Sequence, residues 1–268
     1  MNEKLEKYLV PLANRLFGKQ SPYTMPEKRF VIRPVGMILE DLCKIDDSEW
    51  ANYAFSREPL GGKFDDSQRL NLTQKALECG TEYAEKYISH YGTTAPEALA
   101  KKLGLTVDYP QIPQNTERVL FAEFIEPKQI HIYMDGVDKG KKLLGEVGVR
   151  SALGENFNIT SVLLSHEIFH YVEQTHKKDM WTLNYKIELW APKPFRNRST
   201  VAVLSEIAAM GFAKKLSGIS FSPYVMDAFL VYGYAPEAAS ELYEEMMTFS
   251  GRTPRLPEDG AVVPAKTE

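Results

Sequence analysis

The chain has 268 residues, a length that suits one large domain or a catalytic domain with an extension. Apolar residues make up 44% of it, which is enough to build a core and excludes a globally disordered protein. The formal net charge of −4 and the lack of a strongly basic run argue against a surface that binds nucleic acid directly.

The sequence contains no sign of export or membrane insertion. No apolar stretch reaches membrane-spanning length, and the N-terminal run MNEKLEKYLVPLANRLFGK lacks the apolar region of a signal peptide. Cys43 and Cys79 are far apart and form no CxxC pair, so we expect reduced thiols. These features predict a cytoplasmic protein without a membrane partner.

Residues 1–66 have the weakest pattern and predict an N-terminal extension of unknown role. Helical spacing over 2–17 suggests that the extension is mostly helical. Apolar residues such as Ile38 and Trp50 must be buried away from solvent, so we expect the extension to pack on the rest of the chain. A glycine pair at 61–62 marks a loop near its end.

Residues 67–250 have the regular patterns of a folded domain. In chain order they predict helices at about 69–91 and 96–103, a β-hairpin of 118–124 and 129–133, a helix at 159–176, an irregular connection at 177–199, and helices at 201–216, 223–232 and 236–249. Residues 251–268 are rich in Pro and Gly, which predicts a flexible tail. Together, these predicted helices and strands indicate an α+β fold in which a small sheet within 118–134 packs against the helix at 159–176.

Residues 166–170 read His-Glu-Ile-Phe-His, the HExxH pattern. On a helix, the four-residue spacing puts the imidazoles of His166 and His170 on one face, where both can reach one metal ion. Glu167 lies at the flank of that face, where it can accept a proton from water at the metal without being a ligand. The pattern arises by accident in roughly one chain in a hundred of this length. However, the helix is apolar almost all round, and titratable groups inside such a helix are costly unless paired or bound to metal.

A catalytic zinc ion needs a third protein ligand. Glu206 is the best candidate because it is the only acid in the predicted helix at 201–216, where an unpaired carboxylate would be costly. The small residues Ala208, Ala209 and Gly211 would let this helix approach the HExxH helix closely. The alternative is that Glu206 faces solvent or pairs with a cation. Two imidazoles and a carboxylate favour Zn²⁺ over iron or manganese.

Other titratable residues are weaker candidates for the third ligand. His176 is six residues after His170, Glu173 falls on the wrong turn for the metal face, and Glu188 lies in the predicted connection. His131 and His90 suit structural roles better. Peptide hydrolysis also needs a group that stabilises the oxyanion. The sequence does not choose among the candidates for this group, which are Tyr171, Tyr185, His176, Arg196 and Arg198.

The run from Ala98 to Ala213 resembles the ImmA/IrrE-type metallopeptidases, a gluzincin-like group of HExxH zinc proteases. The matching pieces are the short helix at 96–105, the strand at 129–133, the HExxH motif, and Glu206 followed by Phe212-Ala213. The sequence departs from the group at Ala208, where a second acid is often found. The connection between the HExxH motif and Glu206 is also longer than usual.

This resemblance implies a compact zincin-like core over residues 67–250 and one Zn²⁺ per chain, held by His166, His170 and Glu206 with Glu167 as the catalytic base. It further implies a cytoplasmic peptidase that cleaves a regulatory protein, such as a helix-turn-helix repressor. An extended substrate would add as a strand to the sheet edge at 118–124 or 129–133. The alternatives are a zinc-binding regulatory protein without turnover and a metal hydrolase acting on another bond. An intact Glu167 favours catalysis.

Overall fold

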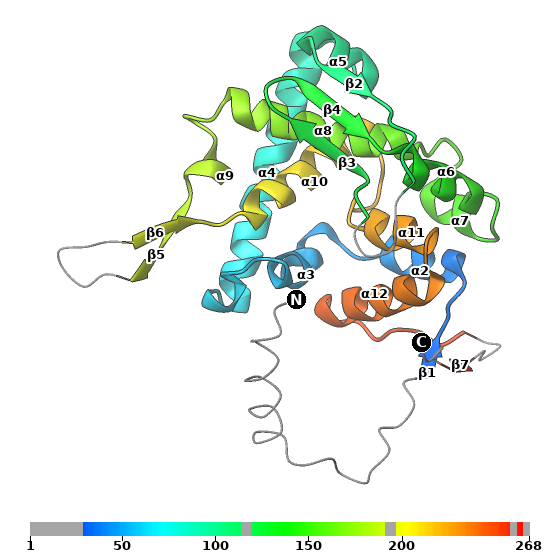
Figure 1. The fold of residues 1–268 in the computed structure, drawn as a ribbon. Coiled ribbons are helices and arrows are strands. Elements are labelled where there is room, and N and C mark those ends of the chain that lie inside the picture. Colours follow the sequence, from blue (N-terminus) through cyan, green and yellow to red (C-terminus); the bar gives the residue numbers. More distant parts are fainter. Residues whose placement is uncertain (1–28, 114–118, 191–196, 258–261, 265–268) are drawn as a thin grey trace, which may run out of the picture.

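Helices α4 (Asp66–Tyr91), α8 (Ile159–Thr175) and α10 (Val203–Ser217) lie together at the centre of the fold, and α10 packs on both of the others (Figure 1). The computed structural model describes residues 29–113, 119–190, 197–257 and 262–264. The helix predicted at 2–17 lies outside them. The described residues form an α+β fold of many helices and small sheets, as predicted.

Small residues bring α10 into backbone contact with α4. A Cβ atom added at Gly80 of α4 would lie 1.9 Å from the carbonyl oxygen of Ala208, and one added at Gly211 would lie 2.6 Å from that of Leu77. No larger side chain fits either position without moving a helix. The expectation that Gly211 serves the approach to the HExxH helix is therefore wrong, because Gly211 faces α4.

Strands β2 (Thr106–Asp108), β4 (Gln129–Ile132) and β3 (Ala122–Ile125) form a three-stranded sheet in that order. β3 and β4 pair antiparallel as the predicted hairpin, although β3 begins at residue 122. β2 pairs parallel with β4. Ile130 and Ile132 are fully buried and alternate with half-buried polar residues, so one face of the sheet packs on α8. β3 is an edge strand.

The connection between α8 and α10 is more regular than predicted. It contains the short helix α9 (Trp181–Asn184) and the antiparallel pair β5 (Lys186–Trp190) and β6 (Asn197–Thr200). The pair extends away from the helices in Figure 1. The prediction of an irregular connection was wrong: polar and apolar residues alternate over Lys186–Leu189, which is the period of a strand.

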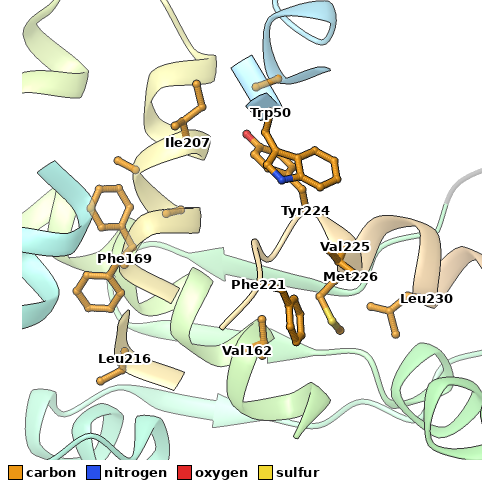
Figure 2. Close-up of a cluster of buried hydrophobic side chains, with 14 of the residues drawn as sticks. Trp50, Val162, Phe169, Ile207, Leu216, Phe221, Tyr224, Val225, Met226 and Leu230 are labelled. Carbon is orange, nitrogen blue, oxygen red and sulfur yellow. The ribbon is translucent and has the colours of Figure 1, made fainter. Parts of the chain in front are cut away.

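The segment before α4 shares its core with the end of the chain. Helices α2 (Val35–Leu42) and α3 (Ala51–Ser56) pack with α11 (Val225–Tyr232) and α12 (Pro236–Phe249). Trp50 precedes α3, is fully buried, and stacks on Tyr224 with 5.4 Å between the ring centroids (Figure 2). Ile38 and Leu39 are also fully buried. Residues 29–66 therefore help to hold α11, which begins directly after Tyr224.

The remaining elements complete the described fold. α5 (Pro96–Leu103) was predicted, whereas α6 (Met134–Leu143) and α7 (Val149–Leu153) were not. The short turns η1 (Asp47–Trp50) and η2 (Gly61–Lys63) flank α3, and β1 (Arg29–Val31) pairs antiparallel with β7 (Val262–Pro264).

The segment after α12 was expected to be a flexible tail, but its first residues contact the N-terminal segment. Arg252 pairs with Glu49 at 2.7 Å, and Arg255 pairs with Asp41 at 2.7 Å. Cys43 and Cys79 are free thiols, as expected. No helix among the described residues has the length and apolar character needed to cross a membrane.

Candidate metal centre

Helices α8 and α10 bring His166, His170 and Glu206 together. Asn158 caps the N-terminus of α8 by accepting a hydrogen bond from Ser161, and the helix then presents both imidazoles on one face. One ligand atom from each of the three residues lies within 4.8 Å of the others. This is the set of metal ligands predicted from the sequence.

The spacing of these atoms suits a tetrahedral metal site. The two Nε2 atoms are 3.2 Å apart, and the Glu206 carboxylate oxygens lie 3.3 Å from His166 Nε2 and 3.7 Å from His170 Nε2. Ligands at the usual zinc distances in a tetrahedron are about 3.3 Å from one another. The donor set and its spacing therefore fit Zn²⁺, which His166, His170 and Glu206 would hold.

At this centre, the negative charge of Glu206 and the positive charge of His166 stabilise each other. The Glu206 side chain is 53% exposed, so it faces solvent as well as the two histidines. Partial desolvation raises its pKa, but the hydrogen bond from His166 and the charges of both imidazoles lower it to about 2. Burial lowers the pKa of His166, but the bond to Glu206 and the charge of Glu167 raise it to about 9. His166 therefore carries a proton at pH 7 when no metal is bound, and a metal ion must displace it.

Glu167 lies beside this centre under the sheet. Its side chain is 7% exposed, and burial raises its pKa, whereas the nearby imidazoles and a backbone hydrogen bond from Phe124 of β3 lower it. It is not among the three clustered ligands. A carboxylate in this position can take up and give back a proton without leaving its place.

A carboxylate from the N-terminal segment supports the helix that carries Glu206. Glu58 is buried, and its Oε2 accepts a hydrogen bond from the backbone N–H of Val203, the first residue of α10. Its other oxygen accepts from the N–H of Leu60. A negative charge at a helix N-terminus is stabilising, so Glu58 holds the turn from which Glu206 projects.

Glu173 lies close to His170, and this neighbour was not predicted from the sequence to serve the centre. It is not one of the clustered ligands, but its Oε2 lies 3.9 Å from His170 Nδ1, the ring nitrogen that faces away from the centre. The carboxylate is buried and accepts hydrogen bonds from Thr182 and from Ser205, the latter at 2.5 Å. The i, i+3 spacing from His170 was the available signal. Carboxylates in this position orient histidine ligands and make them more basic.

We expect Glu173→Gln to weaken zinc binding by roughly tenfold to a hundredfold, because the neutral amide no longer supports the His170 ring. Zinc affinity measured by competition with a fluorescent chelator checks this. Glu188→Gln is the matched control, since Glu188 is exposed on β5 and loses the same charge. Equal affinities for wild type and Glu173→Gln, with both proteins folded, would contradict the assignment.

A cavity of about 230 Å³ opens beside the centre. His166, Glu167 and Glu206 form one side of it, and Asp227 of α11 reaches it from another. The rest of its lining is apolar and comes from the chain around β3 and from α8, α10 and α11. Figure 2 shows three of these apolar residues, Val162, Met226 and Leu230.

Two residues near this cavity had no local signal in the sequence. Asp227 accepts a hydrogen bond of 2.9 Å from the hydroxyl of Tyr53 on α3. Tyr224 is buried, and its hydroxyl has no hydrogen-bond partner among the described residues. Burial raises the Tyr224 pKa, as do the charges of Asp227 and Glu206. Asp227 and Tyr224 lie near the cavity only because α11 packs on the rest of the fold.

The predicted oxyanion groups are not brought to the cavity within the described part of the chain. Tyr171 packs on Phe124, Tyr185 packs on Trp181, and neither lines the cavity. The Nε2 of His176 lies 3.1 Å from the hydroxyl of Tyr87. Arg198 is exposed on β6, and Arg196 lies outside the described residues.

The histidines and the acid that were set aside as ligands also lie elsewhere. His131 sits on the exposed side of the sheet between Asp108 and Glu123, at 3.7 and 3.6 Å. His90 is in the last turn of α4, and Glu188 is exposed on β5. Comparisons with models of protein families, with curated proteins and with solved structures found no match to this chain.

Proposed function

We propose that this protein is a zinc-dependent peptidase with a zincin-like core. The observation that carries the proposal is the arrangement of His166, His170 and Glu206 at tetrahedral spacing, with Glu167 beside them and not among them. A site that only stabilised the fold would have a closed shell of ligands and no use for a base. Here the shell has three protein donors and borders a cavity.

Each residue of the centre has a distinct role in this proposal. His166, His170 and Glu206 hold the ion, and Glu173 keeps the His170 ring in place. Zinc supplies a Lewis acid that lowers the pKa of water and polarises a carbonyl group. Glu167 accepts the proton of the attacking water and then delivers it to the nitrogen of the leaving amine. Its burial keeps bulk water from competing for that proton.

The edge strand β3 is the proposed docking site for an extended substrate. Its free edge is available for main-chain hydrogen bonds, and residues 119–122 at its start line the cavity. A protein substrate would thus lie as an added strand across the centre. The order of motifs that resembles the ImmA/IrrE-type peptidases supports a regulatory protein, such as a helix-turn-helix repressor, as that substrate.

Metal-dependent cleavage tests this proposal. We expect the zinc-loaded protein to cut members of a proteome-derived peptide library, the metal-free protein to cut none, and added zinc to restore cleavage. Mass spectrometry of the new termini is the measurement. A protein that binds one equivalent of zinc and leaves every peptide and repressor candidate intact would instead be a zinc-binding regulator.

A further inference from the structure

The cavity beside the metal centre combines apolar walls with a carboxylate, Asp227, that is neither a metal ligand nor the proposed base. Its walls include Phe121, Val162, Met210, Met226 and Leu230. Asp227 lines the same cavity from α11 and is half-buried. A buried carboxylate is costly unless a cation or several hydrogen bonds compensate its charge.

That compensation is incomplete in the protein alone. One oxygen of Asp227 accepts the hydrogen bond from Tyr53, and the other has no hydrogen-bond partner among the described residues. Two cations act on Asp227 through their charge, Arg57 and His166. Arg57 stacks on the Tyr53 ring and forms its ion pair with Glu245, and neither cation forms an ion pair with Asp227 among the described residues. Burial raises the pKa of Asp227 to about 6, although the Tyr53 bond and the charges of Arg57 and His166 lower it. At pH 7 the carboxylate is therefore mostly ionised, with one hydrogen bond and no ion pair among the described residues.

Asp227 acts on the metal ligands only through its charge, which is one of the causes that raise the pKa of His166. It forms no ion pair with His166 or His170 in the described part of the chain, whereas Glu206 pairs with both rings and Glu173 with one. The buried hydroxyl of Tyr53 needs only a hydrogen-bond acceptor, so it does not require Asp227 to be ionised. The open side of the carboxylate thus faces the cavity that a substrate would enter.

We propose that this cavity is a specificity pocket that binds an arginine or lysine side chain of the substrate next to the cleaved bond, with Asp227 pairing with its cationic end. Apolar walls suit the methylene stem of such a side chain, and a carboxylate suits its charged end. A volume of about 230 Å³ admits one long side chain. This inference rests on the proposed peptidase function and adds the class of residue that it selects.

Binding to a protein that cannot turn over tests the pocket. Zinc-loaded Glu167→Gln is titrated with blocked hexapeptides that carry arginine, citrulline or leucine at each position in turn. Citrulline has the shape of arginine without its charge. We expect arginine at one position to bind at least about tenfold more tightly than citrulline, and Asp227→Asn to remove that difference. Tyr53→Phe is the matched control and should keep it, since it loses the same hydrogen bond but retains the carboxylate.

Equal binding of the arginine and citrulline peptides, or tightest binding of leucine, would overturn the pocket assignment. This comparison needs no variant at Asp227, so a misfolded Asp227→Asn protein does not remove the test. Cleavage of the same peptides by wild type separates the two proposals. Cleavage without a preference for a basic residue contradicts the pocket alone, whereas charge-dependent binding with no cleavage contradicts the peptidase alone.

Discussion

Replacing Glu167 with Gln is expected to reduce peptide hydrolysis by roughly 10²- to 10⁴-fold, the range lost when a general base is removed. The amide has almost the same shape but cannot accept the proton of the attacking water. Because Glu167 is not among the clustered ligands, zinc content should remain at the wild-type level. The free energy of unfolding should stay the same or rise, since a buried carboxyl group, whose charged form burial disfavours, is replaced by a neutral amide.

The measurement is the kcat of a single cleaved peptide, together with elemental analysis of the same samples. Glu123→Gln is the matched control because Glu123 lies on the outward side of β3 beside His131. It changes the same charge close to the centre without reaching the cavity. A Glu167→Gln protein that holds zinc and keeps full activity would show that another group is the base.

Loss of one metal ligand is expected to have the second large effect. We expect His170→Ala and Glu206→Gln each to weaken zinc binding by roughly 10²- to 10³-fold. A four-ligand zinc site binds with about 10–16 kcal/mol, which is about 2.5–4 kcal/mol for each ligand. Wild type should retain about one zinc per chain after dialysis, and both variants should lose it. Elemental analysis and chelator competition are the measurements, with circular dichroism to show that the variants are folded.

His131→Ala and Glu188→Gln are the controls, since both residues were alternative ligands and both lie away from the centre. They should bind zinc as wild type does. A metal-free wild type that takes up no zinc when it is supplied would contradict the metal site, and the HExxH pattern would then be an accident of a buried helix. Loss of zinc in the Glu188 variant would point to a different third ligand.

Local patterns determined much of the fold. The hydrophobic spacing of 159–176 predicted α8 almost to the residue, and turns marked by glycine predicted the ends of α4, α5 and α10. The hairpin of β3 and β4 was also predicted, because its strands are joined by only a few residues. The strands β5 and β6 were not predicted, because each run is short and prolines lie between them in the sequence.

The sequence by itself determined the pair His166 and His170 and the position of Glu167, because a helix fixes the geometry of residues four apart. Glu206 was inferred from the cost of a carboxylate in an apolar helix, but its side chain is 53% exposed, so that reason does not hold. Its meeting with the histidines depends on how α10 packs on α8. The roles of Glu58 and Asp227 were decided only by the tertiary structure. Both lie far from the motif along the chain, and no local periodicity records which distant segments pack together to share one core.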